Sequence, residues 1–200
     1  MIRTGFTIEN PITQSRTVVV TSDQETNGMG WSIESYCVPK AGPDIAEHLH
    51  LTWTETFEII AGTAHYSVDG KQQLAQAGDT FVVLPQQRHI HPWNAGESTL
   101  IYRQTDQFEA AAPEAIQDVL GTFATMAGLA REGKINQKGL PKNPLQLAAT
   151  MRTLGKHGNY DAALPIPVQQ LLGATLGRLA EALGYRAVYP QYVNHNGNKT

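Results

Sequence analysis

The 200-residue chain has one cysteine, few charged residues and no long uninterrupted run of hydrophobic residues. A lone thiol, Cys37, cannot form a disulfide within the chain, so the composition does not require an oxidising compartment. Charged residues make up 16% of the chain, below the roughly 25% of an average soluble domain. Because no basic stretch stands out, we expect no nucleic-acid partner.

The most apolar long segment covers residues 164–185, and Gln169, Arg178 and Glu181 interrupt it. A transmembrane helix needs about 20 mostly apolar residues, so this segment does not predict one. Residues 1–10 also lack the apolar stretch of a signal peptide. We therefore expect a cytoplasmic protein without a membrane partner.

Composition divides the chain into two parts and a short tail. Residues 1–108 hold most of the aromatic and β-branched residues and many turn signals, which predicts a mainly β domain. Residues 109–193 are rich in Ala, Leu, Gly and Gln, which predicts an α-helical extension packed on the β domain or on a dimer partner. Residues 194–200 are polar and predict a disordered tail.

In the first part, short apolar segments alternate with turns, which is typical of an antiparallel β-sandwich or β-barrel. Residues 55–67 predict one long strand that ends at Asp69-Gly70, a strong signal for a tight hairpin. Shorter strands are expected around residues 16–21, 31–38 and 98–104.

In the second part, helices are expected from Pro113 to about Arg131, from Pro144 to about Lys156 and from Pro165 to about Gly184. The last helix carries an apolar stripe at spacings of three and four residues, formed by Val168, Leu172, Thr175, Leu176, Leu179 and Leu183. Such a stripe has to be covered by the β domain or by a second subunit. A membrane surface is disfavoured because the polar face of this helix is not basic.

Histidine and glutamate residues in the first part are spaced as metal ligands. His48 and His50 lie two residues apart and would point to the same face of a strand. Glu55 follows a short loop, and His89 could complete the site from a third strand. Three imidazoles and one carboxylate suit one divalent metal ion (Fe, Mn, Zn, Ni or Co) and leave coordination positions open. A lone His-x-His is often only surface polarity, so the site depends on all of these residues meeting.

A fixed spacing links these ligands to two glycines: Gly42, five residues, His48-x-His50, four residues, Glu55, six residues, Gly62. This spacing resembles the first conserved motif of the cupin superfamily and fits it at every position.

The family's second motif is matched more loosely. It begins at Gly78, and His89 follows eleven residues later, as in the family. The family has a Gly just before this His, where the present chain has Gln86-Gln87. The family's Asn usually follows its His by four residues, whereas Asn94 lies five after His89 and three after His91. His91 therefore stays an alternative to His89 as the third histidine ligand.

The resemblance covers about residues 30–105 and implies an antiparallel double-stranded β-helix, the jelly-roll or cupin barrel. It also implies a metal deep in the barrel, a small-molecule ligand or substrate entering from one mouth, and a homodimer. Four aromatic residues are the candidates for the walls of the pocket: Tyr36, Phe57, Trp93 and Tyr102.

We expect a metal-dependent, dioxygenase-like enzyme that acts on a small organic substrate, with Glu55 as a metal ligand that can also accept a proton. Two other functions stay open: a non-catalytic protein that binds or senses a small ligand, and a metal-assisted isomerase or lyase. The fold does not select among them. No nucleophile elbow or dinucleotide-binding fingerprint supports a hydrolase or a nicotinamide dehydrogenase.

Overall fold

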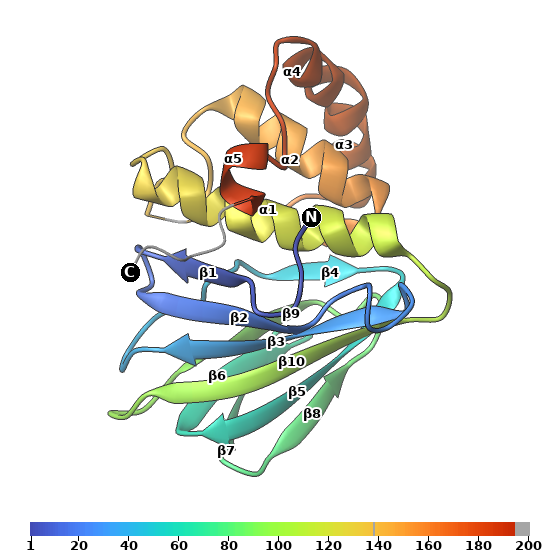
Figure 1. Ribbon diagram of the computed structural model, residues 1–200. Helices are drawn as coiled ribbons and strands as arrows, with labels where there is room; N and C mark the ends of the chain where they lie inside the picture. Colours follow the sequence, from blue (N-terminus) through green and yellow to red (C-terminus); the bar gives the residue numbers. More distant parts are fainter. Residues whose placement is uncertain (138, 195–200) are drawn as a thin grey trace.

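The computed structural model describes residues 1–137 and 139–194, and within them the chain forms a six-stranded and a five-stranded sheet with helices along one side (Figure 1). Sheet A has the strand order β1-β2-β3-β10-β5-β8, and sheet B has the order β11-β4-β9-β6-β7. The strands are β1 (Thr7–Asn10), β2 (Ser15–Thr21), β3 (Gly30–Cys37), β4 (His48–His50), β5 (Trp53–Ala61), β6 (Thr63–Val68), β7 (Lys71–Gln76), β8 (Thr80–Val83), β9 (His89–Asn94), β10 (Leu100–Phe108) and β11 (Asn159–Asp161).

Strands β3 to β10 pair as one long antiparallel hairpin that is folded back on itself. At its tip β6 pairs with β7, followed by β5 with β8, β4 with β9 and β3 with β10. Successive pairs alternate between sheet B and sheet A, so the long hairpin winds into a barrel. This confirms the predicted mainly β fold, an antiparallel double-stranded β-helix followed by a helical region.

The tip of the hairpin lies where the sequence predicts it. Val68 pairs with Lys71, and the two residues between them, Asp69 and Gly70, have φ angles of 49° and 74°. A two-residue turn with both φ angles positive matches the twist of the flanking strands, and Asp-Gly is among the sequences that favour it.

The expected long strand over 55–67 is two strands, because the chain changes sheets at Gly62. β5 lies in sheet A and β6 in sheet B. Gly62 has a φ of +84°, and a Cβ atom there would lie 2.8 Å from the carbonyl oxygen of Thr99. Only glycine combines this backbone conformation with such a close approach. The period-two pattern of the segment gave no sign of the break.

Two apolar clusters fill the barrel, with a polar layer between them. The inward-facing residues of β10 show the order: Leu100 and Tyr102 belong to one cluster, Gln104 and Asp106 to the polar layer, and Phe108 to the other cluster. The first cluster consists of Cys37, Phe57, Ile59, Ala64, Tyr66, Ala75, Val83, Leu100 and Tyr102. The second includes Trp31, Ile33, Trp53 and Phe108 and continues into the first helix through Ile116, Val119 and Leu120.

The helices lie along one side of the barrel (Figure 1). They are α1 (Pro113–Arg131), α2 (Pro144–Lys156), α3 (Ile166–Leu172), the π-helical turn η1 (Gly173–Gly177), α4 (Arg178–Ala182) and α5 (Pro190–Val193). The side chain of Asn143 caps α2 by accepting a hydrogen bond from the amide of Leu145. In the part of the chain that the structure describes, no helix is long and apolar enough to cross a bilayer.

One strand of sheet B comes from the region that the sequence predicts to be helical. β11 pairs with β4, with Asn159 opposite His50 and Asp161 opposite His48. Three residues are too few to give a recognisable strand pattern, so this strand was not expected. Of the tail expected over residues 194–200, all but Asn194 lies outside the described residues.

The sheet change at Gly62 gives a stability prediction. Gly62→Ala should lower the free energy of unfolding by about 2 kcal/mol, because alanine resists the positive φ and its Cβ would meet Thr99 and Leu100. Gly42→Ala is the matched control, since a Cβ at Gly42 meets nothing within 4 Å and its φ is not positive. Urea denaturation of both variants measures the difference, and equal midpoints would contradict the role given to Gly62.

Candidate metal centre

His48 and His50 both point into the barrel from β4, a three-residue strand held on both sides. β9 pairs with β4 on one side, where His89 lies opposite His48. β11 pairs with it on the other side, along its full length. Both His side chains are buried, and His50 is completely so. The backbone of the His-x-His segment is therefore fixed by two neighbouring strands.

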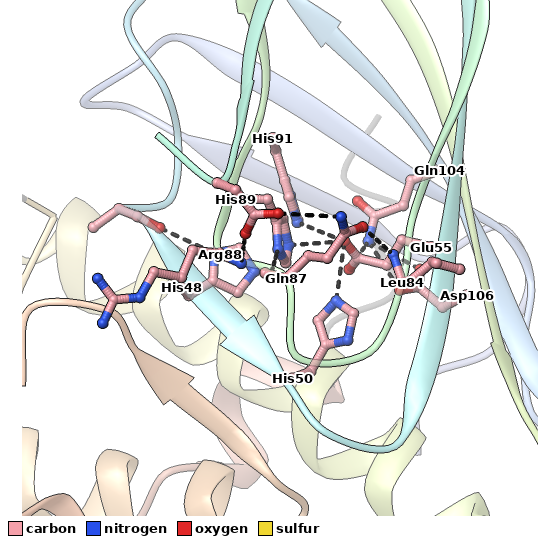
Figure 2. Close-up of polar contacts among 12 residues, drawn as sticks. His48, His50, Glu55, Leu84, Gln87, Arg88, His89, His91, Gln104 and Asp106 are labelled. Atoms are coloured by element: carbon pink, nitrogen blue, oxygen red, sulfur yellow. Dashed lines mark hydrogen bonds and ion pairs between the residues drawn. The ribbon is translucent and has the colours of Figure 1, made fainter. Parts of the chain in front are cut away.

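Glu55 faces these histidines from the opposite sheet. It lies on β5, and its side chain is 2% exposed. One carboxylate oxygen, Oε2, lies 2.9 Å from Nε2 of His89, 3.2 Å from Nε2 of His50 and 3.5 Å from Nε2 of His91. Figure 2 shows His50 approaching this carboxylate from the side opposite His91. The barrel thus brings together His50, Glu55 and His89, which the sequence placed on three separate strands.

His91, the alternative ligand, lies in the tightest group of donors. One ligand atom from each of His48, Glu55, His89 and His91 lies within 4.8 Å of the other three. His50 is not in this group, although it touches Glu55. Its ring lies on the far side of the cluster from His48, with the two ring centroids 6.3 Å apart. All four histidines near Glu55 are thus candidate ligands: His91 belongs to the group of four, whereas Nε2 of His50 lies nearer to Oε2 of Glu55, at 3.2 Å against 3.5 Å for His91.

The donor atoms at the centre are aimed at one place without being hydrogen-bonded to one another. Nε2 of His50, His89 and His91 and Oε2 of Glu55 are buried and form no aligned hydrogen bond among the described residues. Leaving buried polar atoms without partners costs free energy, and here the unsatisfied atoms converge. A divalent cation would satisfy them together, so the residues present fit a metal ion.

Backbone carbonyl groups orient two of the imidazoles. Nδ1 of His48 lies 3.0 Å from the carbonyl oxygen of Ala46, and Nδ1 of His89 lies 3.0 Å from that of Gln87. A carbonyl oxygen can only accept, so each Nδ1 carries the proton and donates it. The lone pair of each neutral ring is then on Nε2, which for His89 is the atom beside Glu55. This is the usual arrangement behind a metal-bound histidine.

Gln104 and Asp106 hold Glu55 in place from β10. Nε2 of Gln104 donates to Oε1 of Glu55 at 3.0 Å and to Oδ2 of Asp106 at 2.9 Å. The other oxygen of Glu55 stays directed at the histidines. Neither residue was predicted from the sequence, although both occupy the inward-facing positions of β10 together with Leu100, Tyr102 and Phe108. Polar residues at positions otherwise taken by apolar ones are the signal that could have found them.

Burial and neighbouring charges separate the pKa values of the two carboxyl groups. Burial raises the pKa of Asp106 well above its usual range, and the charge of Glu55 raises it further. Burial acts on Glu55 in the same direction, but the imidazoles around it outweigh burial and hold its pKa well below its usual range. Asp106 is therefore the protonated member of the pair, and Glu55 carries the negative charge.

The same surroundings shift the pKa values of three of the histidines. Burial, with repulsion from neighbouring imidazoles, lowers the pKa of His48 and of His91, so both rings are neutral at pH 7. Burial also acts to lower the pKa of His89, but the adjacent Glu55 carboxylate outweighs it and the pKa is raised. Neutral imidazole is the form that binds a metal. A cation at this centre, whether a proton or a metal ion, balances the charge of Glu55.

Aromatic rings pack around the cluster. The ring of His50 stacks on Trp53 at a centroid distance of 4.3 Å, and Phe57 lies 5.2 Å from His91. Tyr102 is buried one apolar layer away, with its ring 6.1 Å from Phe57. Phe57 and Tyr102 thus lie inside the barrel, where the sequence analysis placed them.

The other two expected pocket residues lie elsewhere. Tyr36 is only partly buried; its hydroxyl donates to Glu34, and the guanidinium of Arg16 lies over its ring. Trp93 is also partly buried, and its ring lies 5.5 Å from that of His65. The pairing of β6 with β9 shifts register between His65 and Ser67, so alternation counted from His89 fails before it reaches Trp93.

One comparison with known protein families matches the barrel. The family model described as "Cupin domain" matches residues 35–102, which span the strands that carry the ligands. The comparison with curated proteins gave no match.

Solved structures of low sequence identity resemble part of this chain in their fold. A protein from Thermotoga maritima described as a predicted oxalate decarboxylase is 17% identical with a TM-score of 0.46, over 53% of this chain and 93% of that chain. An RmlC-like cupin from Shewanella frigidimarina is 19% identical with a TM-score of 0.41, over 54% of this chain and 85% of that chain. At these TM-scores the likenesses say nothing about activity.

The motif spacing, the nested strand pairing and the family match agree on one region of the chain. That region contains each of the four histidines that surround Glu55. Residues 35–102 are therefore a cupin domain.

Proposed function

We propose that this protein is a metal-dependent enzyme acting on a small organic substrate, with oxygenase chemistry as the leading reaction class. The observation that carries the proposal is the convergence of unsatisfied imidazole nitrogens on Oε2 of Glu55 inside the barrel. A structural zinc site needs four protein ligands and is closed. Here histidine donors are present in excess, and the site lies in a fold whose interior can admit a small molecule.

His48, Glu55, His89 and His91 would hold the ion, with His50 adjoining Glu55. When bound, a divalent ion of this kind supplies Lewis-acid or redox chemistry. Imidazole and carboxylate ligands suit Fe, Mn, Co, Ni and Zn alike. Five protein donors within reach favour a metal that accepts more than four ligands.

The protein's own residues have separate tasks. Gln104 binds one oxygen of Glu55 and leaves the other available to the ion or to a substrate proton. Trp53 and Phe57 exclude water on two sides of the cluster by packing against His50 and His91. Among the four histidines around Glu55, His48 and His91 keep the largest exposure, 7% and 5%. Access is therefore narrow, which favours a small substrate arriving beside these two rings.

The first prediction concerns metal content. Protein purified without chelators should carry about one divalent ion per chain, and Glu55→Gln should weaken metal binding by more than about 100-fold, because it removes the buried charge that the ion balances. Glu58→Gln is the matched control, since Glu58 lies on the same strand with its side chain 53% exposed. Plasma mass spectrometry and competition with a chelator measure both. Metal-free wild-type protein that takes up no ion on titration would end the proposal.

A second prediction separates His50 from His91. His91→Ala should weaken metal binding more than His50→Ala, because the ligand atom of His91 lies within 4.8 Å of those of His48, Glu55 and His89. Chelator competition on both variants gives the ranking, and circular dichroism checks that both remain folded. The reverse order would return His50 to the ligand position that the sequence predicts for it.

A third prediction tests the reaction class. The protein loaded with Fe(II) should consume dioxygen in the presence of one member of a panel of catechols, flavonols, thiols and diketones, and Glu55→Gln should abolish the uptake. Turnover of sugars or keto acids without oxygen uptake would instead assign an isomerase or lyase. A firmly bound ion with no turnover on any panel would assign a non-catalytic protein that binds or senses a small ligand.

A further inference from the structure

The helical region exposes a row of large apolar side chains. α3, η1 and α4 form one continuous helical run, and the residues on its outer side are 42–64% exposed in the part of the chain that the structure describes. We call this surface the leucine face; it consists of Val168, Leu171, Leu176 and Leu179 on the run, with Leu164 just before it and Leu183 just after it. The barrel therefore does not cover the apolar stripe that the sequence predicts to be buried.

Small residues explain why the leucines face outward. Gly173, Gly177 and Ala180 are the buried side of the run, packed on α2. A Cβ atom at Gly177 would lie 2.7 Å from Cβ of Arg152, so the two backbones are in close contact. Rotating the helix to bury the leucines would replace these small residues with bulky ones at the contact. The outward direction of the leucine face is thus fixed by packing on the other side.

The π-helical turn aligns the leucine face. A π turn holds more residues than an α turn, so the residues after η1 are rotated relative to a plain α-helix. Leu176 inside η1 and Leu179 after it are exposed, and so is Leu171 before it. Leu172, which the sequence places in the stripe, is only partly exposed. The exposed row therefore differs from the one predicted with a uniform helical period.

The leucine face is large for a monomer. Its six side chains expose on the order of 500 Å² of mostly apolar surface, close to the upper end for the largest patch on a monomeric protein. Two such faces packed together would bury on the order of 1,000 Å² in total, which is about the least that a biological interface needs. A patch of this size is expected to have a partner of its own.

The residues of the leucine face are spaced symmetrically along the sequence. Each residue before the midpoint between Gly173 and Ala174 has a counterpart at the same distance after it. The counterparts are Leu164 and Leu183, Val168 and Leu179, and Leu171 and Leu176. An antiparallel pair of identical helical runs centred on this midpoint would place Val168 opposite Leu179 and Leu171 opposite Leu176, with Leu164 and Leu183 beyond the two ends of the run. A two-fold dimer requires such a self-complementary surface.

Charges do not oppose this arrangement. Glu181 is turned towards α2, where it forms an ion pair with Arg152 at 3.0 Å. Arg178 is exposed, and its counterpart position across the midpoint is Gln169, so the two Arg178 side chains of a pair would not face each other. The leucine face itself contains no charged residue.

We infer that the leucine face binds a second copy of this chain, with the two helical runs antiparallel and the two-fold axis near Gly173 and Ala174. The dimer contact lies on the helical region, and the outer faces of the two sheets remain free. This inference does not depend on the metal centre or on the proposed activity.

Sedimentation velocity of the full chain tests the contact. The wild-type protein should sediment as a dimer of twice the 21.8 kDa chain mass, and Leu171→Glu should give a monomer with unchanged circular dichroism. Leu74→Glu is the matched control, because Leu74 on β7 is 63% exposed, against 64% for Leu171. It should leave the dimer intact. A monomeric wild type would overturn the inference, as would a dimer that Leu74→Glu disrupts and Leu171→Glu does not.

Cross-linking tests the antiparallel register. When Leu171→Cys and Leu176→Cys proteins are mixed and mildly oxidised, they should form a disulfide-linked heterodimer faster than either forms a homodimer, because the two positions face each other across the axis. Cys37 should not interfere, since it is buried and burial raises its pKa to about 12. Preferred homodimers of each variant would indicate a parallel contact and overturn the register.

Discussion

A buried carboxylate has to be balanced by positive charge or by hydrogen-bond donors, and the arrangement inside this barrel follows from that requirement at Glu55. One oxygen is satisfied by Gln104, and the other faces imidazole rings from the opposite sheet. Backbone carbonyl groups direct the Nε2 lone pairs of two rings inward. Without a cation at its centre the negative charge of Glu55 is not balanced, which links the fold of the barrel to metal binding.

The sequence was sufficient to predict the barrel and the residues that meet in it. Alternation along a strand puts His48 and His50 on one face, although the same alternation did not reveal the change of sheet at Gly62. The same alternation puts His89 and His91 on one face too, so it cannot choose between them. That choice depends on the separation of the sheets and the stagger of the strands, which a one-dimensional pattern does not contain.

Two other features could not be predicted from the sequence, each for a different physical reason. Gln104 and Asp106 matter because of what they contact across the barrel, and no local pattern reports such contacts. The direction of the leucine face was missed because apolar periodicity tells which residues share a side of a helix, and it does not tell which side is buried. Here small residues decided the matter through a close helix–helix contact at Gly177.

The strand β11 has a consequence for how the molecule holds together. It belongs to the helical half, yet it forms the outer edge of sheet B and pairs with the whole of β4. If residues after Arg131 were cut away, the backbone of the His-x-His strand would become an open sheet margin, prone to fraying or to pairing with a foreign strand. The barrel that carries the metal donors therefore depends on β11, a strand from the helical half, to cover the free edge of β4.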